Sequence, residues 1–410
     1  MGVTTADAVL AVDAGNSKTD VALVGVDGTV LGTGRGGGFR PQVAGREAAV
    51  DVLAAAVAQA MRGAGAVADT GAGGLPGGGV GGVSGAGAGG GGGSGVGGSG
   101  AGGSGAGGSG AGGHGAGGHG AGGHGAGRSG RLVRVVHVSA CLANADLPVE
   151  EDELARALEA RGWGGSVRVR NDTFAVLRAG VDEPRGVAVV CGAGINCVGM
   201  LPDGRTVRFP ALGRLSGDWG GGGGLADEAL WHAARAEDGR GAPTELARAL
   251  PAHFGLDSMY ALIEALHLGR VPDARRHELA PVVFAVGAAG DPVARALVER
   301  LADEVVTMAV VALGRLGLRD APEPVPVVLG GGVLAAGHAE LNGRVAELLR
   351  ERAPGAVPRV VKAPPVLGAA LLGLDDVGAR GAAGEALRAW FTPGQEPPGS
   401  LRCSPRRGIE

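Results

Sequence analysis

The stretch AVLAVDAGNSKTDVALVGVDGTV, residues 8–30, joins two apolar runs through a short polar bend, DAGNSKTD. The first run brings Asp13 to the start of the bend, and the second run leaves it. Asp27-Gly28 then separates the second run from a third, and Asp-Gly between apolar runs is typical of a β-hairpin. The stretch therefore predicts a three-stranded meander with strands at 8–13, 20–25 and 29–33.

Length and charge limit the class of protein. The chain has 410 residues, 37 basic against 41 acidic, and a net charge of -4. This length predicts about two domains, and the absence of a basic excess argues against nucleic-acid binding. No apolar run approaches the ~20 residues of a membrane-spanning helix, and the N-terminus does not resemble a signal peptide. Four cysteines are too few for a disulfide framework, so we expect a cytoplasmic protein.

Residues 71–130 differ from the rest of the chain, because 36 of these 60 residues are Gly. Such a segment has little to bury and a high cost of ordering, so we expect a disordered, flexible insert. His114, His119 and His124 recur at intervals of five within it. A metal-binding role is an alternative, but Gly-rich chain would not preorganise the three side chains, and we favour a slipped repeat.

Outside the insert, strands and helices alternate in an order that occurs twice, first from Ala8 and again from Gly186. A helix is expected at about 45–62, with Ala48, Val52, Ala55 and Ala56 on one face. After the insert, strands are expected at 131–138, 166–172, 186–191, 325–330 and 358–362. Helices are expected at 150–162, 173–179, 224–316 (several), 336–351 and 366–374. An internal duplication of this kind implies two similar α/β domains that face one cleft.

Each copy contains a bend of small residues, DAGNSKTD in the first and CGAGINC in the second. Small residues let backbone amides approach an anion, and consecutive amides form an anion-binding concavity. Two such bends could hold a polyphosphate from opposite sides. Asp13, at the end of a strand, could bind Mg²⁺, which takes one or two carboxylates and keeps several waters. Either bend alone could equally be an ordinary hairpin turn.

Two further carboxylates stand at element boundaries. Asp172, in VRVRNDTFAVLRAG, lies where a strand stops and a helix begins. It could cap the helix, or act as a general base in phosphoryl transfer. Asp218, in LGRLSGDWGGGGGLADEAL, could bind hydroxyl groups of a polar ligand or be a simple loop residue.

The glycines at 330–332, in VPVVLGGGVL, make a tight turn that suits either a flat group such as adenine or helix–sheet packing. The turn matches neither the Rossmann nor the Walker A pattern. Cys191 and Cys197 flank the second bend, and we interpret them as buried, inert thiols.

These segments together resemble the BadF/BadG/BcrA/BcrD ATPase family, and within it the N-acetylglucosamine kinases. The resemblance spans about residues 8–376 apart from the insert, and also rests on HVSACLANADLP and PPVLGAALLGL. It implies the fold of actin, Hsp70 and the sugar kinases, with two duplicated ribonuclease H-like domains and an ATP cleft between them. The expected parts are an N-terminal domain (1–183), a C-terminal domain (184–376) and a C-terminal helix and tail (377–410).

The resemblance also implies roles for individual residues. Phosphates of Mg-ATP would be held by Gly15, Asn16, Ser17 and Thr19, with Asp13 on the metal, and from the other domain by Gly192, Ala193 and Gly194. The base on the sugar hydroxyl would be Asp172. The sugar would contact Ser139, Asn196 and Asp218. The adenosine would meet Gly330, Gly331 and Gly332.

The resemblance favours an ATP-dependent sugar kinase that phosphorylates the 6-OH of an amino sugar, with N-acetylglucosamine as the acceptor. The loop after the third strand lacks the Asn that these kinases carry there, and Arg40 or Gln42 is the candidate replacement. Glucosamine or another hexose is therefore an alternative acceptor. A second hypothesis is an ATPase that activates a redox enzyme of the acyl-CoA dehydratase or reductase type, and a third is a sugar-sensing relative without turnover. The sequence leaves open whether the protein forms a homodimer.

Overall fold

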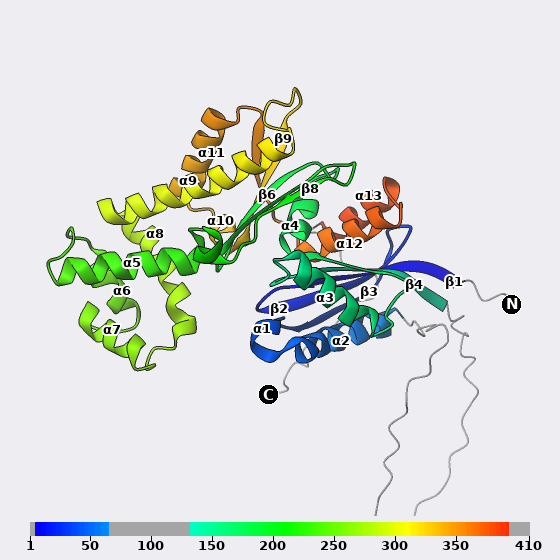
Figure 1. Cartoon of the computed structure of the whole chain (residues 1–410), viewed down its shortest axis with the longest axis horizontal. Coiled ribbons are helices and arrows are strands. Elements are labelled where there is room, and N and C mark those ends of the chain that lie inside the picture. Colours follow the sequence, from blue (N-terminus) through cyan, green and yellow to red (C-terminus); the bar gives the residue numbers. More distant parts are fainter. Residues whose placement is uncertain (1–4, 65–131, 393–410) are drawn as a thin grey trace, which may run out of the picture. The chain divides into compact units, whose positions relative to one another are not determined.

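The computed structural model describes residues 5–64 and 132–392, which belong to one compact unit of the chain. The Gly-rich insert with its three histidines, and the tail after residue 392, lie outside the described residues. Two separate five-stranded sheets form the framework (Figure 1).

The first sheet contains the meander predicted from the opening stretch. Its strands lie in the order β3-β2-β1-β4-β5. Their bounds are β1 (Thr5–Ala14), β2 (Lys18–Gly25), β3 (Val30–Gly37), β4 (Leu132–Leu142) and β5 (Val167–Asn171). The pairs β1–β2 and β2–β3 are antiparallel, whereas β1–β4 and β4–β5 are parallel.

The second sheet repeats this topology. Its strands lie in the order β10-β9-β6-β7-β8. Their bounds are β6 (Gly186–Cys191), β7 (Ile195–Met200), β8 (Thr206–Arg208), β9 (Val325–Gly330) and β10 (Ala356–Val360). The pairs β6–β7 and β7–β8 are antiparallel, and β6–β9 and β9–β10 are parallel. The predicted duplication, with strands in the same order and sense in each copy, is therefore confirmed.

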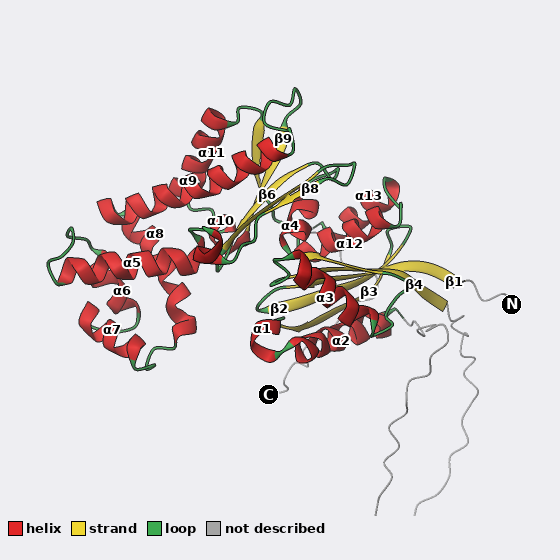
Figure 2. Ribbon diagram, viewed as in Figure 1, coloured by secondary structure: helices red, strands yellow, loops and turns green. Residues whose placement is uncertain are grey.

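Helices cover both faces of the first sheet (Figure 2). On one face lie α1 (Pro41–Ala44), α2 (Arg46–Gly63) and α3 (Pro148–Glu159); on the other lies α12 (Pro365–Asp376). The helix α2 approaches β3 closely because β3 has Gly32 and Gly34, where a Cβ would lie 2.1 and 2.0 Å from helix carbonyl oxygens.

The apolar face predicted for α2 does not coincide with the face that the helix buries. Of the four residues expected there, only Ala56 is buried, while Ala48 and Ala55 are exposed. The residues that α2 buries are Ala49, Val50, Leu53, Ala56, Val57 and Ala60. The larger apolar side chains decide the orientation, because they remove more apolar surface from water than the alanines do.

A mostly helical region joins β8 to β9, as predicted. It contains η1 (Gly213–Ser216), α5 (Gly221–Glu237), α6 (Leu246–His253), α7 (Met259–His267), η2 (Asp273–Leu279), α8 (Ala280–Ala288) and α9 (Pro292–Arg315). After β9 come α10 (Gly331–Ala335) and α11 (Ala339–Arg352). These helices share one apolar core with the second sheet.

The helix α12 returns to the first sheet, although the prediction grouped residues up to 376 with the second domain. It packs on β1, on β4 and on α4 (Thr173–Gly180). The approach of α12 to α4 depends on Gly368, where a Cβ would lie 1.8 Å from the carbonyl oxygen of Ala175. The core that contains α4 and α12 also includes residues of both sheets, such as Val9 and Val328. The boundary at 183/184 stays a prediction.

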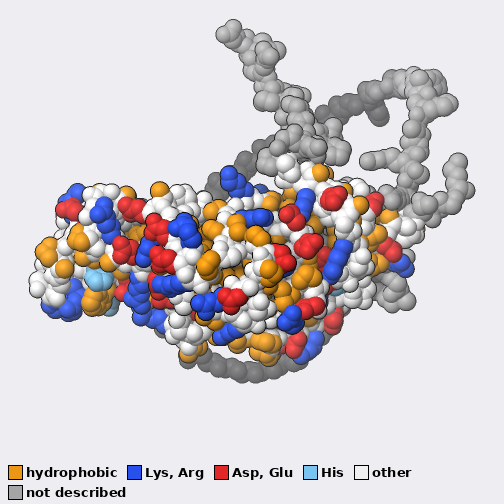
Figure 3. Space-filling model, turned by 90° about the horizontal axis from the view of Figure 1, so that it is seen from above, with side chains coloured by type: hydrophobic (Ala, Val, Ile, Leu, Met, Phe, Trp, Pro, Cys, Tyr) orange, Lys and Arg blue, Asp and Glu red, His pale blue; other side chains and the backbone are white. Residues whose placement is uncertain are grey.

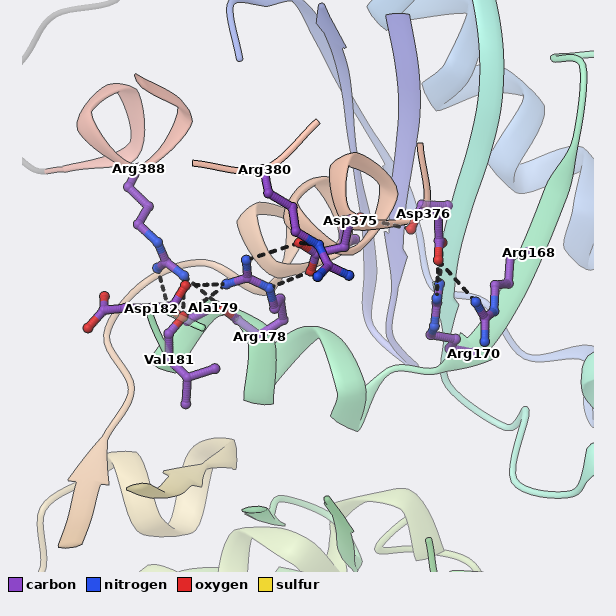
Figure 4. Close-up of polar contacts among 12 residues, drawn as sticks. Arg168, Arg170, Arg178, Ala179, Val181, Asp182, Asp375, Asp376, Arg380 and Arg388 are labelled. Carbon is purple, nitrogen blue, oxygen red and sulfur yellow. Dashed lines mark hydrogen bonds and ion pairs between the residues drawn. The ribbon is translucent and has the colours of Figure 1, made fainter. Parts of the chain in front are cut away.

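Two adjacent carboxylates at the end of α12 fix this packing (Figure 4). Asp375 accepts from Nε of Arg178 on α4 at 2.7 Å. Asp376 accepts two hydrogen bonds from Arg170 on β5, at 2.9 and 2.7 Å. Burial acts to raise the pKa of Asp376, but His137 and Arg170 outweigh it and hold the pKa well below its usual range.

The last described helix, α13 (Ala382–Phe391), is attached to the same place. Its Arg388 donates to the backbone carbonyls of Arg178, Ala179 and Val181 at the end of α4. The C-terminal helices are thus tied to the strand–helix unit that carries Asp172.

Basic and acidic side chains are interspersed over the face of the molecule drawn in Figure 3. None of the helices within the described ranges is both long enough and apolar enough to cross a membrane.

Candidate active site

The first bend connects β1 to β2. The amide of Gly15 donates to the carbonyl of Lys18 at 2.9 Å and closes the bend. Asn16, Ser17 and Lys18 are exposed, and among the described residues the amides of Asn16 and Ser17 have no acceptor. Lys18 forms an ion pair with Asp20 at 2.8 Å instead of extending over the bend. The bend therefore has two free backbone donors, and its binding of an anion stays a prediction.

The second bend connects β6 to β7 in the same way. The amide of Gly192 donates to the carbonyl of Gly194 at 2.9 Å, and Ala193 and Gly194 are exposed. In the described part of the chain the amides of Ala193 and Gly194 also lack an acceptor. The two bends are thus alike in topology and in having two free amides, although the closing hydrogen bond spans three residues in the first bend and two in the second.

The start of α5 supports the second bend from behind. The amides of Gly222 and Gly223 donate to the carbonyls of Gly192 and Ala193 at 2.7 and 3.0 Å. Gly221 has a φ of 73°, and a Cβ there would lie 2.5 Å from the carbonyl oxygen of Ala193. Close backbone packing therefore requires glycine at Gly221, whereas a Cβ at Gly224 would meet nothing within 4 Å.

Asp13 lies at the end of β1, beside the first bend, with only 8% of its surface exposed. Burial raises the pKa of this carboxyl to about 8, and the nearby charges of Asp172 and Asp20 act in the same direction. No group of three or more His, Cys, Asp or Glu side chains in residues 5–64 and 132–392 is arranged to hold a metal ion. A buried carboxylate of this kind would be stabilised in its charged form by a cation.

Asp172 follows β5 and stands at the first position before α4. Its side chain makes no capping hydrogen bond to the helix. The preceding residue, Asn171, accepts instead from the amide of Thr173 at 2.9 Å. The cap of α4 is therefore Asn171 and not Asp172, and the general-base role of Asp172 stays a prediction.

The environment of Asp172 makes it a stronger base than a free carboxylate. Burial raises its pKa to about 6, and the amide and hydroxyl of Thr173 offset part of that effect. At neutral pH the group is mostly ionised and still has appreciable proton affinity, which is what general base catalysis requires.

Asn171 also links three segments of the site. Its amide nitrogen donates to Asp146 at 2.8 Å, and its oxygen accepts from Asn196 on β7 at 3.0 Å. Burial raises the pKa of Asp146 to about 7, and the charge of Asp172 adds to this. Sequence reasoning missed both Asn171 and Asp146, although each lies within a segment quoted for the family resemblance.

Asp218 lies on the loop after η1, partly buried, and accepts from the hydroxyl of Ser216. Its charge also raises the pKa of Asp146. The structure therefore brings Asp13, Asp172, Asp146, Asn196 and Asp218 into one electrostatically connected set.

Two predicted site residues are not brought to this set. Ser139 is fully buried in β4 and donates to the carbonyl of Ala369 on α12 at 2.8 Å. Thr19 is also fully buried, and its hydroxyl donates to the carbonyl of Gly37 on β3 at 2.8 Å. Both hydroxyls are thus used inside the protein, because the strand pleat turns these side chains to a buried face of the sheet.

The three glycines of the turn after β9 differ in how closely other atoms approach them. A Cβ at Gly330 would lie 2.6 Å from Val176, and one at Gly331, where φ is 82°, would lie 2.4 Å from the carbonyl oxygen of Cys191. Gly332 is exposed and has open space around it. Close packing accounts for the first two glycines, and Gly332 is the one available to a ligand.

The cysteines argue against the redox hypothesis. Cys191 and Cys197 are both fully buried within β6 and β7. Burial raises the pKa of the Cys191 thiol to about 12 and also raises that of Cys197. Thiols buried in this way are inert, and they cannot reach a cluster shared with a partner chain.

The duplicated sheets define a protein of the actin and sugar-kinase fold. A family model for the BadF/BadG/BcrA/BcrD ATPase family matches residues 10–373. The chain therefore belongs to this family.

Characterised relatives and solved structures are similar to this chain. An N-acetyl-D-glucosamine kinase from Dictyostelium discoideum is 27% identical over 246 residues, which cover 58% of this chain and 75% of the relative. An N-acetylmuramic acid/N-acetylglucosamine kinase from Clostridium acetobutylicum is 27% identical over 163 residues, 40% of this chain and 53% of the relative. The solved structure of a presumed N-acetylglucosamine kinase from Chromobacterium violaceum has a TM-score of 0.56 at 21% identity, covering 89% of this chain and 98% of the other. This last similarity supports the fold.

The raised pKa of Asp13 predicts an unusual pH dependence of stability in protein free of nucleotide and magnesium. The folded carboxyl has a pKa of about 8 against an ordinary value of 3.8, so between these pH values the folded state holds a proton that the unfolded state has lost. The free energy of unfolding should therefore decrease as pH rises from about 5 to about 8. Urea denaturation at several pH values measures it.

The matched variant is Asp13→Asn, which should have a smaller slope over the same range. Asp146 and Asp172, whose pKa values are also raised, leave part of the slope in place. Equal slopes for the two proteins would show that Asp13 is not protonated in the folded state.

Proposed function

We propose that this protein is an ATP-dependent sugar kinase that transfers the γ-phosphate of ATP to the 6-OH of an amino sugar, with N-acetylglucosamine as the acceptor. The observation that carries the proposal is the carboxylate of Asp172, which is partly buried, raised in pKa and released from capping α4 by Asn171. Family membership and the two kinase relatives support the same activity.

The residues around the two bends fit Mg-ATP. Four exposed backbone amides, those of Asn16, Ser17, Ala193 and Gly194, suit phosphate oxygens. Asp13 would hold Mg²⁺, directly or through water, as a single carboxylate commonly does. The bound metal would neutralise charge on the phosphates, and Gly332 would lie against the adenosine.

Asp172 would accept the proton of the sugar hydroxyl as that oxygen attacks the phosphorus atom. The chain's contribution is mainly to position the hydroxyl and to exclude water, which would otherwise compete for the phosphoryl group. Asn196 and Asp218 remain the proposed sugar contacts. Ser139, which is buried against α12, is not included. Cytoplasmic location stays a prediction.

A coupled assay of ADP release over a panel of sugars tests the proposal. The panel contains N-acetylglucosamine, glucosamine, N-acetylmannosamine, N-acetylmuramic acid and glucose. We expect the highest kcat/KM with N-acetylglucosamine, and a 6-phosphate product by phosphorus NMR. ATP hydrolysis that no sugar stimulates would reject a kinase, and a preference for glucosamine or glucose would replace only the acceptor.

A further inference from the structure

Asn144 has a backbone conformation that few residues other than glycine adopt. Its φ is 63°, in the left-handed region, which Asn tolerates better than most side chains. It lies just after β4, two residues before Asp146. A strained position beside a candidate active site indicates that its side chain has a purpose there.

The side chain of Asn144 connects two other loops. Its amide nitrogen donates to Oδ1 of Asn16 in the first bend at 2.9 Å. The same nitrogen donates to the backbone carbonyl of Phe39, after β3, at 3.2 Å. Phe39 is fully buried, and its own amide donates to the carbonyl of Gly15 at 2.9 Å. Asn144 therefore joins the first bend to an anchored neighbour.

These contacts also fix which way the side-chain amide of Asn16 points. A backbone carbonyl can only accept, so the Asn144 atom that faces Phe39 must be the nitrogen. The Asn16 atom that faces this nitrogen must then be the oxygen. The amide nitrogen of Asn16 is left with two free donors on an exposed residue beside the free amides of the bend.

We propose that Asn144 is a positioning residue that orients Asn16 as a hydrogen-bond donor to the phosphates of the nucleotide. This inference rests on the proposed function, because it assumes that the first bend binds phosphate. It predicts that the loss of the Asn144 side chain weakens nucleotide binding without weakening the fold.

Two substitutions preserve the backbone conformation and separate these effects. Asn144→Gly removes the amide and relieves the left-handed strain, which offsets the greater freedom of glycine in the unfolded chain, so thermal stability should change little. Asn144→Asp tolerates the same φ but offers only acceptors, so Asn16 must turn its nitrogen inward to meet it. The Asp variant should therefore bind the nucleotide more weakly than the Gly variant.

Calorimetric titration with the unreactive analogue Mg-AMPPNP measures the effect without any phosphoryl transfer. Loss of one side-chain hydrogen bond to a charged group predicts a Kd about 10- to 150-fold higher for Asn144→Gly, and a larger increase for Asn144→Asp. In an Asn16→Ala background, Asn144→Gly should add little, because Asn144 acts through Asn16.

The outcomes separate this inference from the proposed function. Unchanged affinity in Asn144→Gly, or a full effect that persists in the Asn16→Ala background, would overturn the proposed role of Asn144. Nucleotide binding by the first bend would still be supported by the affinity of the wild-type protein. A wild-type protein that binds no Mg-AMPPNP would overturn both. A drop in thermal stability that parallels the loss of affinity would also overturn it, because the role would then be structural.

Discussion

Asp172→Asn should lower kcat by about 10³-fold, because the amide cannot accept the proton of the attacking hydroxyl. The fold should be unaffected, since Asn171 caps α4. Stability at pH 8 should be equal or slightly higher, because a buried carboxylate with a pKa of about 6 carries an unfavourable charge above that pH and Asn carries none. The steady-state ADP-release assay and thermal unfolding measure the two effects.

The matched control is Asp152→Asn on α3, which removes an exposed carboxylate outside the site. This variant should keep the wild-type kcat. A rate within a few fold of wild type in Asp172→Asn would remove Asp172 from the mechanism. A loss of both activity and stability would instead assign it a structural role.

Asp375→Ala should destabilise the folded protein strongly. Arg178 and Asp375 form an ion pair at 2.7 Å, with 7% and 10% of their side chains exposed (Figure 4). Removal of the carboxylate leaves the Arg178 guanidinium buried without a counter-charge, which costs about 3–5 kcal/mol. Because Arg178 lies on α4, we expect activity to decrease together with the free energy of unfolding measured in urea.

An exposed ion pair on the same protein serves as the control for this buried pair. Glu264 pairs with Arg270 at 2.6 Å, with 42% and 64% of their side chains exposed. Glu264→Ala should cost between about 0 and 1 kcal/mol. Similar costs for the two variants would show that burial of the Arg178–Asp375 pair has little energetic consequence.

Local sequence signals predicted most of the framework. Apolar runs, the Asp-Gly turns and the two small-residue bends placed nearly all of the strands close to their observed positions, because each signal acts over a few residues. The face of α2 that is buried could not be read in this way. It depends on which side chains the first sheet can cover, and on the glycines of β3 that let the helix approach.

Side-chain roles at the site were only partly predictable. Asp13, Asp172 and the two bends could be proposed because strand ends and small residues are visible in sequence, and their roles stay predictions. Thr19 and Ser139 were assigned to ligands, yet both donate to backbone carbonyls inside the protein. Asn171 and Asn144 were missed, because their importance lies in partners 25 and 128 residues away.

The sequence by itself determined the duplicated order of strands and helices, the family and the two small-residue bends. Only the tertiary structure decided which of two neighbouring side chains caps α4. Asp172 and Asn171 are neighbours with similar capping ability, and sequence favours neither as the cap. Hydrogen bonds from Asn196 and to Asp146 hold Asn171 in the capping position, so Asn171 and not Asp172 caps the helix.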